Sequence, residues 1–79
     1  MDVFQAHRFS SGHRAQIEAS EVCACFYCFA KYPPTAIDNW TDNDTTACCP
    51  ECFVDSVIGS ASGVPLDEAF LRRMHAEWF

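Results

Sequence analysis

Two pairs of cysteines are the residues of this chain best suited to chemistry. Cys25 and Cys28 form one Cys-x-x-Cys pair, and Cys49 and Cys52 form a second pair after twenty intervening residues. A two-residue gap lets both sulfurs of a pair reach one ion, and two such knuckles complete the tetrahedral four-sulfur shell that structural zinc prefers. The spacing therefore predicts one Zn²⁺ per chain, held by these four cysteines in a structural role. A closed shell leaves no open position for a substrate.

Iron is the alternative metal. Four cysteine sulfurs also hold a single iron in rubredoxin-like proteins, which would make the chain an electron carrier. In that arrangement a glycine follows the second cysteine of each knuckle, whereas Phe29 and Phe53 stand there in this chain. We therefore expect zinc rather than iron.

A disulfide framework is the alternative to a metal, because the chain has six cysteines. Its first residues contain no apolar run of signal-peptide length, and no segment is apolar over a membrane-spanning length. We therefore expect a cytoplasmic protein, in which disulfides seldom persist. The extra cysteines, Cys23 and Cys48, are expected to be small buried apolar residues, with redox activity as the alternative.

The length of the chain also favours a metal. With 79 residues it buries too little surface for its core alone to hold it securely. We expect a single zinc-binding domain over residues 1–79.

A second group of residues could bind an anion if folding brings its members together. Arginine forks and imidazoles are ligands for phosphate and carboxylate groups. The candidates are His7, Arg8, His13, Arg14, Arg72, Arg73 and His75. The competing interpretation, which we favour, pairs the arginines with acids on helix surfaces, as Glu68 with Arg72. Four thiolates already complete a tetrahedron, so the histidines are not needed as metal ligands.

Asp55 and Ser56 raise the question of hydrolytic chemistry, because a carboxylate can orient a base beside a hydroxyl. No nucleophile elbow or glycine-rich phosphate loop surrounds them. We therefore expect a local turn or cap at these residues, and a protein that is not an enzyme.

The charge of the chain argues against nucleic acid. Five basic residues against eleven acidic ones give a net charge of −6, the wrong sign for neutralising phosphates. No base lies between Lys31 and Arg72, and Asp38, Asp42, Asp44, Glu51 and Asp55 fall in that stretch. This distribution favours a protein partner, and a homo-oligomer is compatible with it. A solvated acidic surface that serves only solubility accounts for it equally well.

The cysteine pairs must be positioned by short elements. Ser10 or Ser11 is expected to cap a helix over residues 13–19, and Thr35 to start one or two helical turns that end near Trp40. Residues 45–48 and 53–58 read as two strands on either side of the second knuckle, which would form a metal-bound hairpin. Residues 59–63 are expected to form a loop.

The C-terminal segment has the clearest pattern. Pro65 and Asp67 introduce a helix, with an apolar stripe at helical spacing that should pack on the metal core. The stripe consists of Leu66, Phe70, Leu71, Met74 and Trp78. The predicted fold class is therefore small α+β. It comprises a zinc-ribbon-like metal-bound β-hairpin with two cysteine knuckles, flanked by a short N-terminal helix and an amphipathic C-terminal helix.

Several motifs spread over nearly the whole chain occur together: Cys25-Phe26-Tyr27-Cys28, Trp40, Cys49-Pro50-x-Cys52, Asp55-Ser56-Val57-Ile58-Gly59 with Ser62-Gly63, and Phe70-Leu71-x-x-Met74-His75-x-x-Trp78-Phe79. With these motifs the chain resembles a family of small bacterial cytoplasmic proteins of zinc-ribbon type. The resemblance implies the fold and the metal but no task, because members of that family usually carry no assigned activity. Similar sequences have glycine where Ala24 and Phe53 stand here, so Phe53 is expected to need a different local backbone or some strain.

These observations together predict a small structural-zinc protein that acts as a protein-interaction, adaptor or inhibitor module. The alternatives are an anion-binding or hydrolytic protein that uses the histidines and arginines, and a rubredoxin-like electron carrier with iron among the four cysteines.

Overall fold

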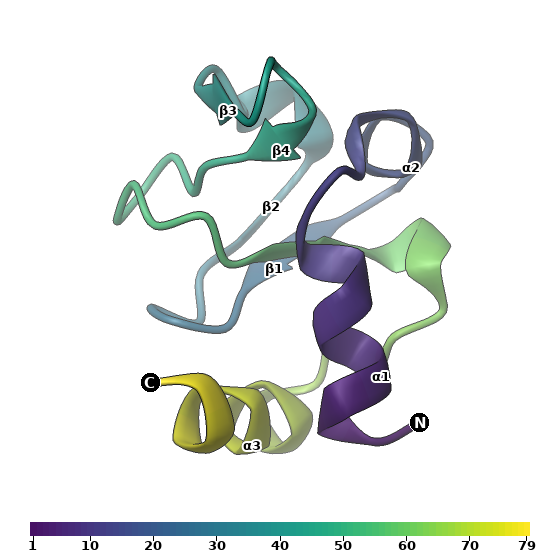
Figure 1. Ribbon diagram of the computed structural model, residues 1–79, viewed down its shortest axis with the longest axis vertical. Helices are drawn as coiled ribbons and strands as arrows, with labels where there is room; N and C mark the ends of the chain where they lie inside the picture. The colour runs from purple at the N-terminus through teal and green to yellow at the C-terminus, as the bar shows by residue number, and fades with distance from the viewer.

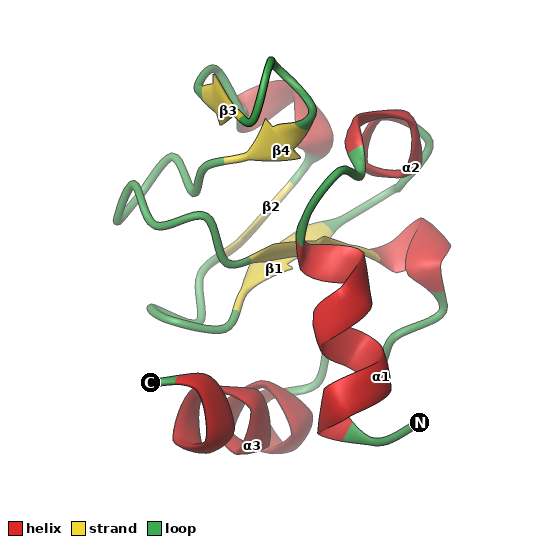
Figure 2. Ribbon diagram, in the orientation of Figure 1, coloured by secondary structure: helices red, strands yellow, loops and turns green.

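The computed structural model describes residues 1–79 and has an α+β architecture (Figure 1). Three helices, five short strands and three 3₁₀ turns follow one another along the chain (Figure 2). The helices are α1 (Val3–His7), α2 (Arg14–Glu18) and α3 (Glu68–Trp78), and the 3₁₀ turns are η1 (Arg8–Ser10), η2 (Pro34–Ala36) and η3 (Ser60–Ser62). The strands are β1 (Cys23–Cys25), β2 (Lys31–Tyr32), β3 (Trp40–Thr41), β4 (Thr46–Ala47) and β5 (Val57–Gly59).

The strands form two small antiparallel sheets. The larger has the order β2-β1-β5, with Cys23 opposite both Tyr32 and Gly59. The smaller pairs β3 with β4 and places Trp40 opposite Ala47. The central strand β1 runs directly into the first cysteine knuckle, and β2 leaves it, so this knuckle closes a hairpin.

The hairpin expected around the second knuckle is not formed. Residues 45–48 contribute β4, which pairs with β3, whereas residues 53–58 contribute only the start of β5, which pairs with β1. Burial explains the difference. Val57 and Ile58 are fully buried, and a strand with apolar residues on both faces belongs beside a central strand. The second knuckle therefore connects the two sheets.

Two apolar clusters lie on opposite faces of the larger sheet. Successive side chains of a strand point to opposite faces. Ala24 of β1 and Ile58 of β5 accordingly join a cluster with residues of α1 and α3, whereas Cys25 and Val57 join a second cluster with the remaining knuckle cysteines. In Figure 1, α1 and α3 lie on one side of this sheet, and α2, β3 and β4 lie on the other. The expectation that α3 packs on the metal core holds only in part. Its buried apolar stripe lies across the sheet from the cluster that holds the cysteines. Its outer residues Arg72 and His75 contact the first knuckle at Phe29 and Phe26.

Helix α3 begins where the sequence predicted. The Phe70 backbone N–H donates to Asp67 Oδ1 at 2.9 Å, and Phe70, Leu71 and Met74 are buried. The predicted stripe is incomplete at its end, because Trp78 is 36% exposed. No helix of the structure is both long and apolar enough to cross a membrane.

The N-terminal half differs from expectation in its caps and turns. The expected helix over 13–19 is α2, but His13 occupies its N-cap, and its side chain makes no capping hydrogen bond, while Ser10 Oγ donates to the His7 carbonyl. Helix α1 was not predicted, although Asp2 and Gln5 form a capping box at its start. The turns expected from Thr35 to Trp40 shorten to η2.

The chain after η2 is extended and enters β3 at Trp40. The loop expected over residues 59–63 contains the last residue of β5, the 3₁₀ turn η3 and a left-handed Gly63.

Candidate metal centre

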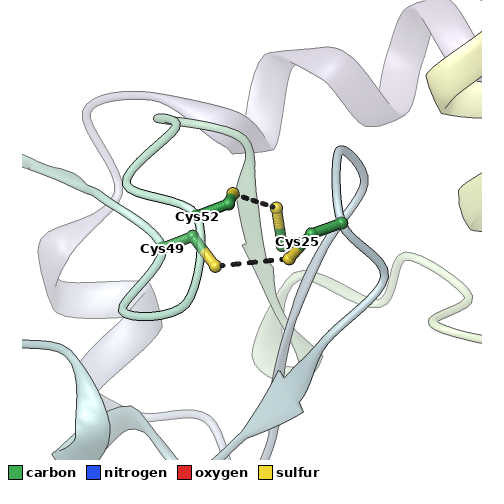
Figure 3. A group of neighbouring side chains, drawn as sticks. Cys25, Cys49 and Cys52 are labelled. Atoms are coloured by element: carbon green, nitrogen blue, oxygen red, sulfur yellow. Dashed lines mark hydrogen bonds between the residues drawn. The ribbon is translucent and has the colours of Figure 1, made fainter.

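The four predicted cysteines converge on one point between the sheets. Their sulfur atoms all lie within 4.8 Å of one another, and the Cys25–Cys52 and Cys28–Cys49 pairs are each 3.7 Å apart. A tetrahedron with metal–sulfur bonds of about 2.3 Å has edges of about 3.8 Å. A disulfide would need sulfurs about 2.05 Å apart. Figure 3 shows the sulfurs of Cys49 and Cys52 facing the knuckle of Cys25. The arrangement thus fits a metal ion held by four thiolates.

Both knuckles use the same turn. The N–H of Phe29 donates to the Cys25 carbonyl and the N–H of Phe53 to the Cys49 carbonyl, each at 2.9 Å. Within each turn a backbone N–H also faces the first sulfur, from Tyr27 to Cys25 at 3.3 Å and from Glu51 to Cys49 at 3.4 Å. These donors favour the ionised thiolates that metal binding requires.

Phe29 and Phe53 adopt the left-handed backbone that glycine would supply. Their φ angles are 67° and 68°, in a region that costs a residue with a side chain about 1–2 kcal/mol. The expectation that Phe53 needs a different local backbone is therefore wrong, and its second alternative, local strain, holds. The lack of glycine after each knuckle consequently no longer argues against iron, because the knuckle conformation is present without it.

Two hydroxyl groups approach the buried sulfurs from the sheet. Ser56 Oγ lies 3.1 Å from Cys25 Sγ, and Ser56 is 1% exposed. The Tyr32 hydroxyl is buried without a hydrogen-bond partner, and Tyr32 packs in the same buried cluster as Cys49. The sequence predicted no role for the Tyr32 hydroxyl and a local turn or cap at Ser56. The Ser56 hydroxyl faces the Cys25 sulfur rather than a backbone group of a local turn or cap.

The thiols differ in their tendency to ionise. Burial opposes ionisation of Cys49, but the Tyr32 hydroxyl, neighbouring backbone N–H groups and the Cys28 thiol outweigh it and lower its pKa to about 7. Burial raises the pKa values of Cys28 and Cys52, and the sulfurs of Cys25 and Cys49 reinforce this effect. These two thiols therefore stay protonated until a cation binds and displaces the protons.

The two remaining cysteines lie outside the cluster. Cys23 is fully buried, and burial raises its pKa to about 11, as expected for a small apolar residue. Cys48 is half-buried, and burial followed by the charges of Asp55 and Asp42 raises its pKa. Neither residue has the low thiol pKa of a reactive cysteine.

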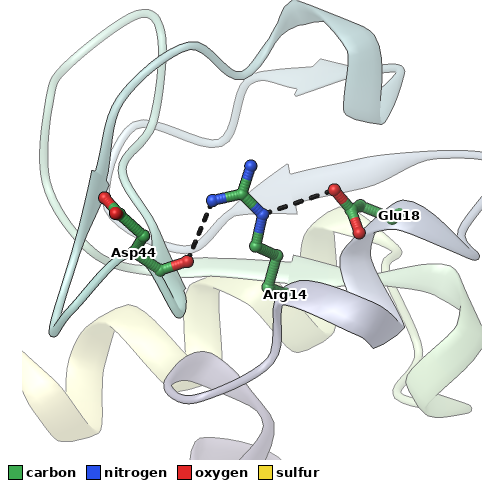
Figure 4. A network of polar contacts seen from close by, with 3 residues as sticks. All are labelled: Arg14, Glu18 and Asp44. Atoms are coloured by element: carbon green, nitrogen blue, oxygen red, sulfur yellow. Dashed lines mark hydrogen bonds and ion pairs between the residues drawn. The ribbon is translucent and has the colours of Figure 1, made fainter.

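The candidate anion site is not assembled. Arg14 lies on α2, where it pairs with Glu18 at 3.3 Å, donates to the Asp44 carbonyl at 3.0 Å and stacks on Trp40 (Figure 4). Arg72, on α3 across the sheet, pairs with Glu68 at 2.7 Å.

Arg73 stacks on Phe70 instead of pairing with Glu77, and Arg8 lies exposed on η1. The favoured pairing with helix acids is therefore confirmed for Arg14 and Arg72.

The three histidines lie in two environments, His13 in the interior and His7 and His75 among surface aromatic rings. His13 is 5% exposed and structural, because Nδ1 donates to the Phe9 carbonyl at 2.6 Å and Nε2 accepts the Ala47 N–H at 3.0 Å. His7 stacks on Trp78, with ring centroids 3.9 Å apart, and His75 contacts the Phe26 carbonyl. None of them reaches the four sulfurs.

A continuous row of rings covers the other side of the first knuckle and the adjoining helices. We call it the aromatic band; its members are Phe4, His7, Phe26, Tyr27, Phe29, His75, Trp78 and Phe79. Phe4 and Phe79 are more than half exposed, and Tyr27 is 43% exposed. A cavity of about 270 Å³ opens within the band, where Asp55 and Ser56 join its lining. Trp78 and Phe79 thus belong to the surface.

Comparisons with protein-family models, with curated proteins and with solved structures found no match to this chain.

Proposed function

We propose that this chain is a small structural-zinc protein of zinc-ribbon type, similar to small bacterial cytoplasmic proteins, that docks on another protein. The observation that carries the metal assignment is the approach of four sulfurs to within 4.8 Å, with two edges close to those of a metal–thiolate tetrahedron. Zinc bound there would supply a fixed crosslink between the two knuckles. Because all four positions are taken by the chain, this role needs no enzyme activity.

The structure supports one metal ion per chain as a stabiliser of the fold. The knuckles are separated by twenty residues; the first closes the β1–β2 hairpin of the larger sheet, and the second connects the two sheets. Four thiolates on one ion would tie the β1–β2 hairpin to the segment that links β4 with β5. Metal binding would therefore contribute directly to the free energy of folding.

The aromatic band supports the docking role. Exposed aromatic rings that adjoin one another are typical of surfaces that bind proteins. The acids Asp38, Asp42, Asp44 and Glu51 are all exposed and lie outside the band. An adaptor or inhibitor would use the band as the contact area, while the acidic residues keep the free protein soluble.

Native mass spectrometry with elemental analysis of freshly purified protein tests the metal assignment. We expect one zinc per chain, and Cys28→Ala should lose the metal and the folded state together. Cys23→Ala is the matched control, because it removes a buried cysteine that lies outside the cluster. A Cys28→Ala protein that stays folded without metal would contradict the structural role.

Crosslinking from the band tests the docking role. A photo-reactive amino acid at position 27 should capture a defined partner in cells, and Phe79→Ser should weaken the affinity of that partner about tenfold. Phe53→Ser is the control, because Phe53 is 69% exposed but lies outside the band. Equal losses of affinity in both variants would refute the band as the contact area.

An iron-containing electron carrier is the second candidate. It is favoured by the repeated knuckle turn, in which backbone N–H groups face Cys25 and Cys49 and the following phenylalanines take the left-handed conformation. Hydrogen bonds to the sulfurs and partial exposure are the features that set the potential of such centres. Protein purified from iron-supplemented cells should show a reversible one-electron couple if this function holds. Zinc as the only bound metal under those conditions would exclude it.

A further inference from the structure

The two halves of the metal centre share a pattern longer than the cysteine pairs. In each half a phenylalanine follows the second cysteine, and a residue with a hydroxyl group stands four positions after that cysteine. The two copies are Cys25-x-x-Cys28-Phe29-x-x-Tyr32 and Cys49-x-x-Cys52-Phe53-x-x-Ser56. The backbone repeats as well, since both phenylalanines have positive φ and both turns close with the same hydrogen bond.

Each hydroxyl group follows one knuckle in the sequence but lies on the side of the other knuckle in the fold. Ser56 follows the second knuckle, and its Oγ lies 3.1 Å from Cys25 Sγ in the first. Tyr32 follows the first knuckle and packs in the same buried cluster as Cys49 of the second. The Ser56 hydroxyl thus approaches the first cysteine of the opposite knuckle, and Tyr32 lies in the buried cluster that contains the first cysteine of the other. These two sulfurs belong to residues with no exposed surface, whereas Cys28 and Cys52 are half-buried.

The Tyr32 hydroxyl lacks a hydrogen-bond acceptor unless a thiolate is present. It is buried and has no partner of standard geometry. A buried hydroxyl without a partner costs about 1–3 kcal/mol, so such groups normally have one. A protonated thiol accepts hydrogen bonds weakly, whereas an ionised sulfur is a strong acceptor. Metal binding would create that acceptor at Cys49.

We propose that Tyr32 and Ser56 are positioning residues of the metal centre, whose hydroxyl groups donate reciprocal hydrogen bonds to the metal-bound sulfurs of Cys49 and Cys25. This inference rests on the proposed metal site. Four thiolates around a divalent ion carry a net charge of about −2, which is costly in a buried site without donors. Backbone N–H groups serve both knuckles, and the two hydroxyls add the side-chain donors for the sulfurs that water does not reach.

Cobalt substitution gives the test. Tyr32→Phe and Ser56→Ala each remove one hydroxyl with little change in shape, and Co²⁺ affinity is measured by competition with a chelator. Each variant should bind Co²⁺ about tenfold more weakly, and the double variant about a hundredfold, because the hydroxyls serve different sulfurs. Tyr27→Phe and Ser11→Ala are matched controls, because both residues are exposed. We expect no change of affinity in the controls.

The absorption spectrum separates hydrogen bonding from packing. Removing a hydrogen bond makes a thiolate a better electron donor, so the sulfur-to-cobalt charge-transfer band should move to lower energy in Tyr32→Phe and Ser56→Ala. Unchanged affinity in these variants would overturn the proposal, and so would weaker binding with an unshifted band, since that is the result of a packing defect. A wild-type protein that binds no Co²⁺ would instead overturn the metal site itself.

Discussion

At the scale of single residues, each knuckle places a phenylalanine in a left-handed backbone conformation that this residue type disfavours. Phe29 and Phe53 have left-handed φ angles, although only glycine takes this conformation without cost. Phe29 is half-buried under the Arg72 guanidinium, whose packing offsets part of the strain. Phe53 is 69% exposed and has no such compensation. The strain at Phe53 is therefore measurable in isolation.

Substitutions at position 53 should reverse the usual ranking of alanine and glycine. Phe53→Gly should be more stable than Phe53→Ala by about 1 kcal/mol, because only alanine retains the left-handed penalty. Position 77 in α3 is the control. There Glu77→Ala should be more stable than Glu77→Gly by about 1 kcal/mol, as is usual within a helix. Chemical denaturation of the four zinc-loaded variants checks both differences. A Phe53→Ala protein as stable as Phe53→Gly would show that the turn carries no strain.

His13 should make the stability of the protein depend on pH. Burial lowers its pKa below the ordinary value of about 6.5, and the hydrogen bond to the Phe9 carbonyl opposes this only in part. Above pH 6.5 the neutral ring of His13 makes its full contribution to the free energy of unfolding. That contribution is lost as the pH falls toward the folded-state pKa, because the unfolded chain binds the proton more readily. A protonated Nε2 would also be unable to accept the Ala47 N–H.

Denaturation of wild type and His13→Gln between pH 7.5 and pH 5.5 measures this effect. At pH 7.5 the variant should be less stable by about 2 kcal/mol, because it loses two buried hydrogen bonds. The difference should shrink as the pH falls. Both proteins keep the four cysteines, so acid release of metal affects them alike. A difference that stays constant over this range would exclude His13 as the titrating group.

At the scale of elements, the sequence predicted what depends on local pattern. Asp67 and the spacing of Phe70, Leu71 and Met74 predicted α3 correctly, because a cap and an apolar stripe are both encoded within one helix. The Cys-x-x-Cys spacing likewise predicted which four sulfurs meet. Strand pairing was predicted incorrectly, since segments of two or three residues carry no periodicity and their partners are chosen by burial.

The side-chain environment of the metal centre could have been found only in part. Ser56 and Tyr32 stand at equal positions after the two knuckles, and this repeat was visible in the sequence. Which sulfur each hydroxyl approaches depends on the crossing of the two knuckles, which no local pattern encodes. The predicted anion site is not formed for a related reason, because Arg14 and Arg72 lie on helices that the sheet separates.

The cap of α3 gives a prediction at this scale. Asp67→Ala should lower the free energy of unfolding by about 1 kcal/mol, because the Phe70 N–H loses its acceptor. Asp67→Asn should keep most of the stability, since an asparagine oxygen can accept the same bond. Thermal denaturation of the three zinc-loaded proteins measures the difference. Equal losses in both variants would point to the charge at the helix start instead of the hydrogen bond.

At the scale of the whole molecule, the two apolar clusters share their strands. Ala24 belongs to the cluster under α1 and α3, while its neighbours Cys23 and Cys25 belong to the cluster that contains the metal ligands. Because the same three-residue strands carry side chains into both clusters, loss of one cluster would also disorder the strands that support the other. The metal centre is therefore expected to stabilise the helical side of the molecule as well, although α3 supplies none of the four sulfurs.

Metal removal should consequently unfold the protein as one unit. Calorimetry should show a single transition in the zinc-loaded protein, and a chelator should lower or abolish it without revealing a second one. Amide exchange provides the residue-level check, because Leu71 and Met74 should lose protection together with Cys25. Persistent protection of α3 after chelation would show that the α1–α3 side folds independently.

The unequal burial of the cysteines has a consequence for how long a metal ion stays bound. Cys25 and Cys49 are sealed in the interior, whereas Cys28 and Cys52 are half-buried at the surface of the cluster. An incoming competitor for a bound ion, such as another thiol or a chelating carboxylate, would therefore meet these two sulfurs first. Exchange would then proceed stepwise, with Cys28 and Cys52 released before Cys25 and Cys49. The residence time of a bound metal would thus depend on competitors in the surrounding solution as well as on the affinity of the site.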